Sequence, residues 1–196
     1  MIAKDNEKFG LGELPPDAIN EWQLAQRSNL PNVLSELNTL VGLGIIRDYA
    51  IGGGYAAIYY GIPYFTFDLD VLVVLGSEED FQMLYNHYRQ KGNKIEDVYI
   101  YIADMPVQFL PNYISPLFNS AIKEAQRIEV NGVPTKVIRV EYLIALLLTA
   151  FRLKDKIRVG ELVKSADTHM LNEILRRFDD GQGLLSKRLK EVLGNP

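Results

Sequence analysis

Several residue types are scarce or absent in this chain of 196 residues, and each absence excludes a class of protein. There is no cysteine, so disulfide scaffolds and thiolate metal centres are excluded. The two histidines, His87 and His169, have no partner at ligand spacing, and we expect them to be packing or surface residues. The longest apolar run, Tyr142–Phe151, is about ten residues and too short to span a bilayer. No signal peptide is recognisable either, so we expect a cytoplasmic protein that does not bind membranes.

The composition is that of a globular protein, with 47% apolar and 23% charged residues. The net charge of −4 is unevenly distributed. Residues 1–150 carry 11 basic against 18 acidic side chains, whereas residues 151–196 carry 10 against 7. A basic C-terminal region is compatible with a phosphate-rich partner and equally with solvated helix faces.

The chain is organised around the segment Asp48–Leu75, which reads DYAIGGGYAAIYYGIPYFTFDLDVLVVL. The pattern predicts a short strand over 49–51, a glycine turn over 52–54 and a brief helix over 55–60 that ends before Pro63. Three glycines leave a backbone without Cβ atoms, which a bulky group such as a phosphate can approach.

Two carboxylates open the next predicted strand, Leu69–Leu75. Asp68 and Asp70 are two residues apart, so on a strand both side chains project from the same face. Their mutual repulsion is tolerable when a divalent cation lies between them, and Mg²⁺ typically takes one or two carboxylates plus substrate phosphates. This layout is typical of phosphoryl or nucleotidyl transfer.

The remaining pattern predicts an α+β fold: a mixed sheet with helices packed on it and an α-helical C-terminal appendage. We expect an N-terminal helical extension (1–30), a core (31–140) and a C-terminal helical region (141–196). A first helix is expected to end at Ser28–Pro31 before a second one over 32–43. The other predicted elements are a helix capped by Ser77, strands over 98–103 and 106–110, a helix over 116–125, a hairpin turning at Asn131-Gly132, and helices over 141–158, 168–178 and 184–193.

Gly53-Gly54, thirteen intervening residues and Asp68-Leu69-Asp70 resemble the GG…DxD signature of the polymerase-β-like nucleotidyltransferase superfamily. The pattern is most similar to the AbiEii-type proteins of abortive-infection and toxin–antitoxin systems, whose motif reads GG-x-A…R-x-T-x-D-h-D. Tyr64 replaces the arginine of that motif. The residues that match are Gly53, Gly54, Ala56, Thr66, Asp68 and Asp70.

This resemblance implies an enzyme that moves a nucleoside monophosphate from a nucleoside triphosphate (NTP) to an acceptor hydroxyl. Asp68 and Asp70 would hold Mg²⁺ or Mn²⁺, and Gly53, Gly54 and Thr66 would lie beside the nucleotide. By analogy with toxin-type members, the acceptor would be RNA, and a cognate antitoxin protein would be a partner.

The third carboxylate of the superfamily usually comes from a later strand beside the DxD strand. Here the resemblance implies that this strand is 106–110, and Gln108 occupies the position. An amide ligates a metal but adds no charge and does not act as a base. Asp104 would substitute only if the preceding turn folds back.

Residues 141–158 resemble the C-terminal helix of the family, E-x-L-I-A-x-K-L…R-x-K-D-x-x-D. Leu147 and Arg158 replace its mid-helix lysine and its last aspartate. The resemblance implies nucleotide binding by Arg152, Lys154 and Arg158 and catalytic roles for Lys154 and Asp155. Lys156 completes a basic cluster suited to a departing polyphosphate. The matching residues are Glu141, Leu143, Ile144, Ala145, Arg152, Lys154 and Asp155.

Two alternatives stay open. A catalytically impaired relative would use the same cleft to bind a nucleotide or a partner, which Gln108 and Leu147 favour. A dinucleotide-binding oxidoreductase is suggested by Gly52-x-Gly54-x-x-Ala57 followed by Asp70. Against it, the intervening helix is short, and the acidic pair starts its strand instead of ending one.

Overall fold

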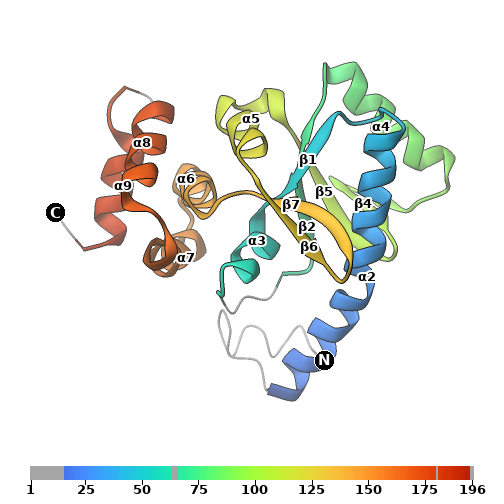
Figure 1. Cartoon of the computed structure of the whole chain (residues 1–196), viewed down its shortest axis with the longest axis horizontal. Helices are drawn as coiled ribbons and strands as arrows, with labels where there is room; N and C mark the ends of the chain where they lie inside the picture. Colours follow the sequence, from blue (N-terminus) through green and yellow to red (C-terminus); the bar gives the residue numbers. More distant parts are fainter. Residues whose placement is uncertain (1–15, 63–65, 180, 195–196) are drawn as a thin grey trace.

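In the residues that the structure describes (16–62, 66–179 and 181–194), seven strands form one mixed sheet, shown in the computed structural model of Figure 1. The strands stand in the order β3-β4-β5-β2-β1-β7-β6. Their bounds are Asp48–Ile51 (β1), Leu69–Val74 (β2), Ile95–Glu96 (β3), Tyr99–Ile102 (β4), Met105–Pro111 (β5), Gln126–Val130 (β6) and Val133–Val137 (β7).

The helices pack on this sheet and continue beyond it towards the C-terminus, so the expected α+β fold is confirmed. Their bounds are Pro16–Gly42 (α2), Gly53–Tyr59 (α3), Glu78–Gln90 (α4), Pro116–Lys123 (α5), Val140–Ala150 (α6), Leu153–Leu162 (α7), Thr168–Phe178 (α8) and Leu184–Val192 (α9). Short 3₁₀ turns lie at Asn112–Ile114 and Val163–Ser165.

The pairing of the central strands excludes the oxidoreductase alternative. β1 and β2 are antiparallel neighbours, whereas a dinucleotide-binding unit joins two parallel strands through its helix. β2 instead runs parallel to β5, in a register that places Asp70 beside Gln108. The acidic pair and the expected third-ligand position therefore lie on adjacent strands.

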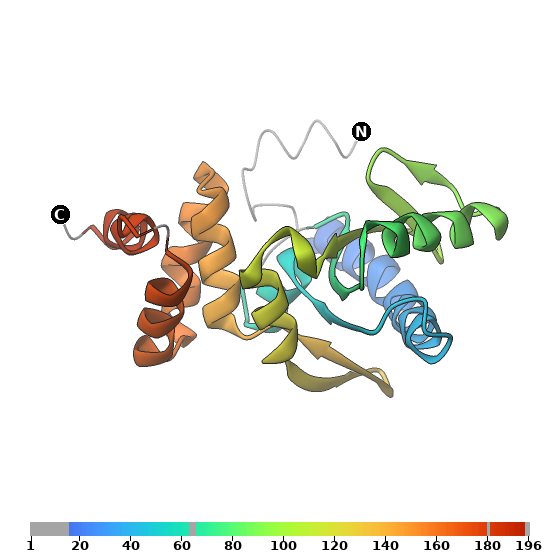
Figure 2. The ribbon, with the colours of Figure 1, turned by 90° about the horizontal axis from the view of Figure 1, so that it is seen from above.

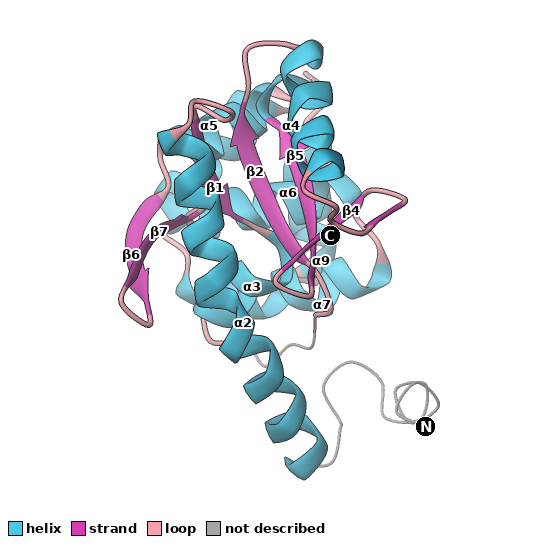
Figure 3. Ribbon diagram, turned by 90° about the vertical axis from the view of Figure 1, so that its right-hand side faces the viewer, coloured by secondary structure: helices cyan, strands magenta, loops and turns pink. Residues whose placement is uncertain are grey.

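Helices cover both faces of the sheet. On one face, the Tyr49 hydroxyl donates to Asn38 Oδ1 of α2 at 2.9 Å, and Phe109 stacks on Tyr88 of α4 with ring centroids 6.3 Å apart. Figure 3 shows α2 crossing in front of the strands. α5 packs against β1 and β2 from the opposite side, as Figures 1 and 2 show.

The N-terminal helices expected on either side of Ser28–Pro31 are a single helix, so that boundary prediction is wrong. α2 continues through Pro31 to Gly42. The proline removes one backbone donor, but Leu30, Val33 and Leu34 beside it are buried in the core. Tertiary packing therefore holds the backbone helical where the local signal predicts a break.

The expected helix over 141–158 is also divided, because Phe151 adopts a left-handed conformation (φ 51°) between α6 and α7. Arg188 of α9 stabilises this break: its Nη1 atom donates to the carbonyl oxygens of Leu148 (2.7 Å) and Thr149 (2.9 Å). These are carbonyls that a helix end leaves without an intrahelical partner. The guanidinium also lies over the Phe151 ring, 4.7 Å from its centroid.

Other local signals act as the sequence predicts. The Ser77 hydroxyl accepts a hydrogen bond from the Asp80 backbone at the start of α4. Asn131 and Gly132 both adopt positive φ between β6 and β7. Among the helices of the described residues, none is long and apolar enough to cross a membrane.

Candidate active site

The three glycines that join β1 to the first turn of α3 lie directly against Asp70 and Thr66. The Gly52 N–H donates to the Asp70 carbonyl at 2.9 Å. A Cβ atom on Gly53, which has a φ of 52°, would lie 1.7 Å from Asp70 Oδ2. A Cβ atom on Gly54 would lie 2.5 Å from the Thr66 Cβ atom. Glycine is therefore required at 53 and 54 by close approach, and at 53 also by backbone conformation.

Asp68 and Asp70 flank buried Leu69 at the start of β2, and both are partly accessible to solvent. Buried Thr66 orients the first of them, because its hydroxyl donates to Asp68 Oδ1 at 2.9 Å. The charge of Asp68 also acts on Tyr99 of β4, whose pKa is raised by burial and then by that charge. The Asp68 carboxylate is therefore oriented by Thr66 and lies near a second hydroxyl group.

The surroundings of Asp70 strongly shift the pKa of its carboxyl. Burial and, next, the charge of Asp68 raise its pKa to about 7. Arg152, Lys154 and a hydrogen bond from the Gly54 backbone act in the opposite direction. Without a cation, the Asp70 carboxyl is therefore close to half-protonated at neutral pH.

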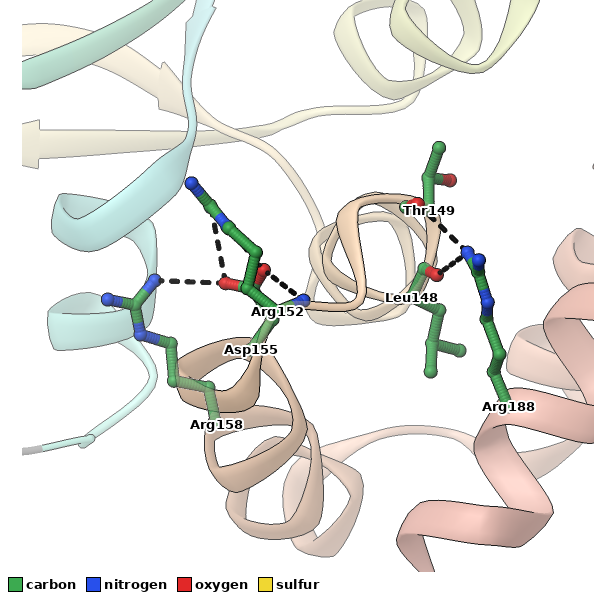
Figure 4. A network of polar contacts seen from close by, with 6 residues as sticks. All are labelled: Leu148, Thr149, Arg152, Asp155, Arg158 and Arg188. Atoms are coloured by element: carbon green, nitrogen blue, oxygen red, sulfur yellow. Dashed lines mark hydrogen bonds and ion pairs between the residues drawn. The ribbon is translucent and has the colours of Figure 1, made fainter.

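The cations that act on Asp70 come from the start of α7, far along the chain from β2. Asp155 holds the first of them: its Oδ2 atom accepts from Arg152 Nε at 2.7 Å and from the Arg152 backbone N–H at 3.0 Å (Figure 4). Asp155 is fully buried, and its carboxylate therefore contacts Arg152 and not solvent. The attraction of Asp155, and more weakly of Asp70, raises the pKa of Arg152.

The four residues of the expected basic cluster do not all face the acidic pair. Lys156 points towards α9, where its Nζ atom contacts Glu191 Oε1 at 2.7 Å and lies 4.2 Å from the Phe151 ring centroid. Arg158 is buried, with its Nη1 atom 3.7 Å from Asp155 Oδ1, and burial lowers its pKa to about 10. The electrostatic influence on Asp70 comes from Arg152 and Lys154, not from Lys156.

Gln108 lies next to Asp70 in the sheet, at the position expected for a third ligand. Asp104 is exposed in the turn between β4 and β5, at a φ of 62°. Within the described part of the chain, no three Asp, Glu, His or Cys side chains gather where they would hold a metal ion. The donor set at this edge is therefore two carboxylates and one amide.

Tyr99 and Tyr55 are the neighbours of the acidic pair that sequence reasoning missed. Tyr99 lies opposite Gln108 in the β4–β5 hairpin, and its pKa is raised by burial and then by Asp68. Burial, and next Asp68, also raise the pKa of Tyr55. The hairpin register was a usable signal, because it carries Tyr99 to the site once Gln108 is placed there. Tyr64, the residue in place of the family arginine, lies outside the described residues.

Comparisons with known proteins place the fold. No family model and no curated protein matches the chain. Among solved structures, it is similar to an antigenic nucleotidyltransferase-like protein from Paracoccidioides brasiliensis (TM-score 0.53, 16% identity, covering 86% of this chain and 98% of that one). It is also similar to the antibiotic-resistance factor ANT(2'')-Ia in solution (TM-score 0.50, 13% identity, covering 84% and 98%). The chain therefore has a nucleotidyltransferase-like fold.

Proposed function

We propose that this protein transfers a nucleoside monophosphate from an NTP to an acceptor hydroxyl. The observation that supports the proposal most strongly is that several groups from different parts of the chain surround Asp70. The Gly53-Gly54 turn contacts its carboxylate, Asp68 lies two residues away, and the start of α7 directs two cations at it. Three segments that are distant in sequence thus build one acidic site with basic residues at its margin.

The donor set fits a divalent cation such as Mg²⁺ or Mn²⁺. Asp68 and Asp70 repel each other enough to help raise the pKa of Asp70 to about 7, and a cation between them would relieve that repulsion. Two carboxylates suit Mg²⁺, whose other ligands are typically waters and substrate phosphates. When bound, the cation would supply positive charge to polarise the reacting phosphate.

The residues of the chain have separate roles in this proposal. Gly53 and Gly54 admit the triphosphate close to the backbone, and Thr66 orients Asp68. The acceptor hydroxyl releases its proton to solvent, and its oxygen forms a bond to the α-phosphorus as the bond from that phosphorus to the β-phosphate oxygen breaks and pyrophosphate leaves. Arg152 and Lys154 offset the charge of the leaving group. Asp155 is a positioning residue for Arg152, and Arg158, buried behind it, supports this arrangement without direct access to the leaving group.

The finer assignment follows the sequence resemblance to AbiEii-type proteins. We propose RNA as the acceptor, a cognate antitoxin protein as a partner and the cytoplasm as the compartment. The basic excess over residues 151–196 supports a phosphate-rich acceptor.

A second candidate function is a nucleotide-binding module without catalysis. Gln108 beside Asp70 favours it, because an amide cannot take the proton that the acceptor hydroxyl releases. This candidate predicts metal-dependent nucleotide binding without product formation.

Thermal unfolding with each NTP, with and without Mg²⁺, tests the site. A ligand at ~100 times its dissociation constant stabilises the folded state by about 2.7 kcal/mol. We expect a Mg²⁺-dependent rise in Tm for the wild type and for Asp104→Asn, an exposed turn variant, but none for Asp68→Asn/Asp70→Asn. No rise with any NTP would overturn the proposal.

A label-transfer assay separates the two candidate functions. With RNA as the acceptor, label from the α-phosphate should become attached to RNA and label from the γ-phosphate should leave as pyrophosphate. Nucleotide binding without transfer to RNA or to other hydroxyl acceptors would favour the binding module.

A further inference from the structure

Strand β6, Gln126–Val130, ends one edge of the sheet. It pairs with β7 on one side, and no strand among the described residues pairs with its other side. Figure 3 shows the β6–β7 hairpin projecting at the margin of the molecule. An edge strand of this kind offers unpaired backbone donors and acceptors to another strand.

The hairpin register fixes which backbone groups face outwards. On the side away from β6, the N–H of Ile138, the residue after β7, donates to the Ile51 carbonyl of β1. The Pro134 carbonyl of β7 accepts a hydrogen bond from the Asn38 side chain. Hydrogen bonding alternates along an antiparallel pair, so Val133 and Thr135 bond to Val130 and Ile128. The N–H and C=O groups of the intervening residues, Arg127 and Glu129, therefore point to the open edge.

These two residues carry opposite charges, and both side chains are exposed. In the described part of the chain neither has an ion-pair partner, whereas neighbouring Lys136 is paired with Asp48. A β6 strand from a second copy, running antiparallel, could pair with this edge in three registers that place outward-facing residues opposite each other. In one register the two Arg127 residues lie opposite each other, and in another the two Glu129 residues do. In the third register, Arg127 of each copy lies opposite Glu129 of the other.

We propose that two copies of this chain pair through β6 in this third register, with Ile128 on the two-fold axis. Arg127 of each copy exchanges two backbone hydrogen bonds with Glu129 of the other copy, which gives four hydrogen bonds in total. Two opposite-charge pairs accompany them, and the half-buried Ile128 side chains of the two copies meet. The result is one sheet continued across two protomers.

Sedimentation equilibrium of the full-length chain tests the self-association. The wild type should populate a dimer whose dissociation constant rises about tenfold in Glu129→Arg, because like charges then oppose each other at two positions. The charge-swapped variant Arg127→Glu/Glu129→Arg should recover the wild-type value. A monomer at all accessible concentrations would overturn the proposal, and so would a dimer that Glu129→Arg leaves unchanged.

The absence of native cysteine allows a direct test of the register. Residues opposed at a non-hydrogen-bonded position have Cα atoms about 4.5 Å apart, within disulfide range. Ile128→Cys should therefore form a disulfide-linked dimer on mild oxidation faster than Arg127→Cys or Glu129→Cys. In those two variants the cysteines of the two copies would be diagonal neighbours across the strand pair, about 7–8 Å apart. Faster linkage at 127 or 129 would contradict this register.

Discussion

Gly53 and Asp70 are packed so closely that a single Cβ atom would not fit between them: it would lie 1.7 Å from Asp70 Oδ2. The turn after β1 and the carboxylate of β2 therefore form one structural unit. A group bound at Asp70 lies beside backbone that carries no side chain, which is the requirement for close approach of a phosphate.

Gly53→Ala should destabilise the protein and displace the Asp70 carboxylate. Gly61→Ala is the matched control, because Gly61 also has a positive φ (84°) but no atom of the described residues lies within 4 Å of the added atom. We expect Gly61→Ala to cost about 1 kcal/mol of unfolding free energy from backbone strain alone. Gly53→Ala should cost about 2–4 kcal/mol because overpacking is added to strain. Equal losses in urea unfolding would contradict the close contact.

Stability should depend on pH through Asp70. The folded state keeps this proton up to about pH 7, whereas the unfolded chain releases it near pH 4. The folded state therefore binds more protons in this window, and the unfolding free energy falls as pH rises through it. Asp70→Asn removes this contribution and should gain stability relative to the wild type between pH 4 and 8, by on the order of a few kcal/mol. A pH-independent difference between the two proteins in urea titrations would refute the assignment.

The two lysines of α7 should differ in their effect on NTP binding. Lys154 acts on Asp70, whereas Lys156 is engaged by Glu191 and the Phe151 ring. Lys154→Ala should weaken NTP affinity by about tenfold or more, the effect of losing one charge-assisted contact. Lys156→Ala should leave the affinity near the wild-type value. Calorimetric titration checks both, and equal effects would show that the basic cluster acts as a whole.

Asp155→Asn should be among the most destabilising polar substitutions in the C-terminal half. It weakens the cap of α7 and leaves the positive charge of buried Arg158 without its acidic neighbour. Breaking a buried ion pair typically costs about 3–5 kcal/mol, whereas an exposed pair contributes about 0–1 kcal/mol. Glu191→Gln, which breaks the more exposed pair with Lys156, is the control. A similar change of Tm in both variants would contradict a structural role for Asp155.

Local chemistry predicted the parts of the fold whose signals lie within a few residues. The Ser77 cap and the Asn131-Gly132 turn have local causes and appear in the structure. The continuity of α2 through Pro31 and the break at Phe151 have no such local cause. They depend on the burial of Leu34 in the core and on the contacts of Arg188, which are tertiary interactions.

The candidate site divides in the same way. Spacing predicted that Asp68 and Asp70 share a face. The family resemblance, not spacing, predicted Gln108 beside the acidic pair, and the sheet places it next to Asp70. Spacing did not predict that Lys156 turns to α9 or that Tyr99 reaches Asp68, since both depend on packing between distant segments. The roles of these residues in metal and nucleotide binding stay predictions.

Binding of Mn²⁺ in the presence of a non-hydrolysable NTP analogue, followed by electron paramagnetic resonance, tests the central claim most directly. The proposal predicts protein-bound Mn²⁺ in the wild type and in Asp104→Asn, and its loss in Asp70→Asn at pH 8, where the wild-type carboxyl is ionised. Mn²⁺ bound equally well by Asp70→Asn, or nucleotide bound by the wild type without Mn²⁺, would contradict it.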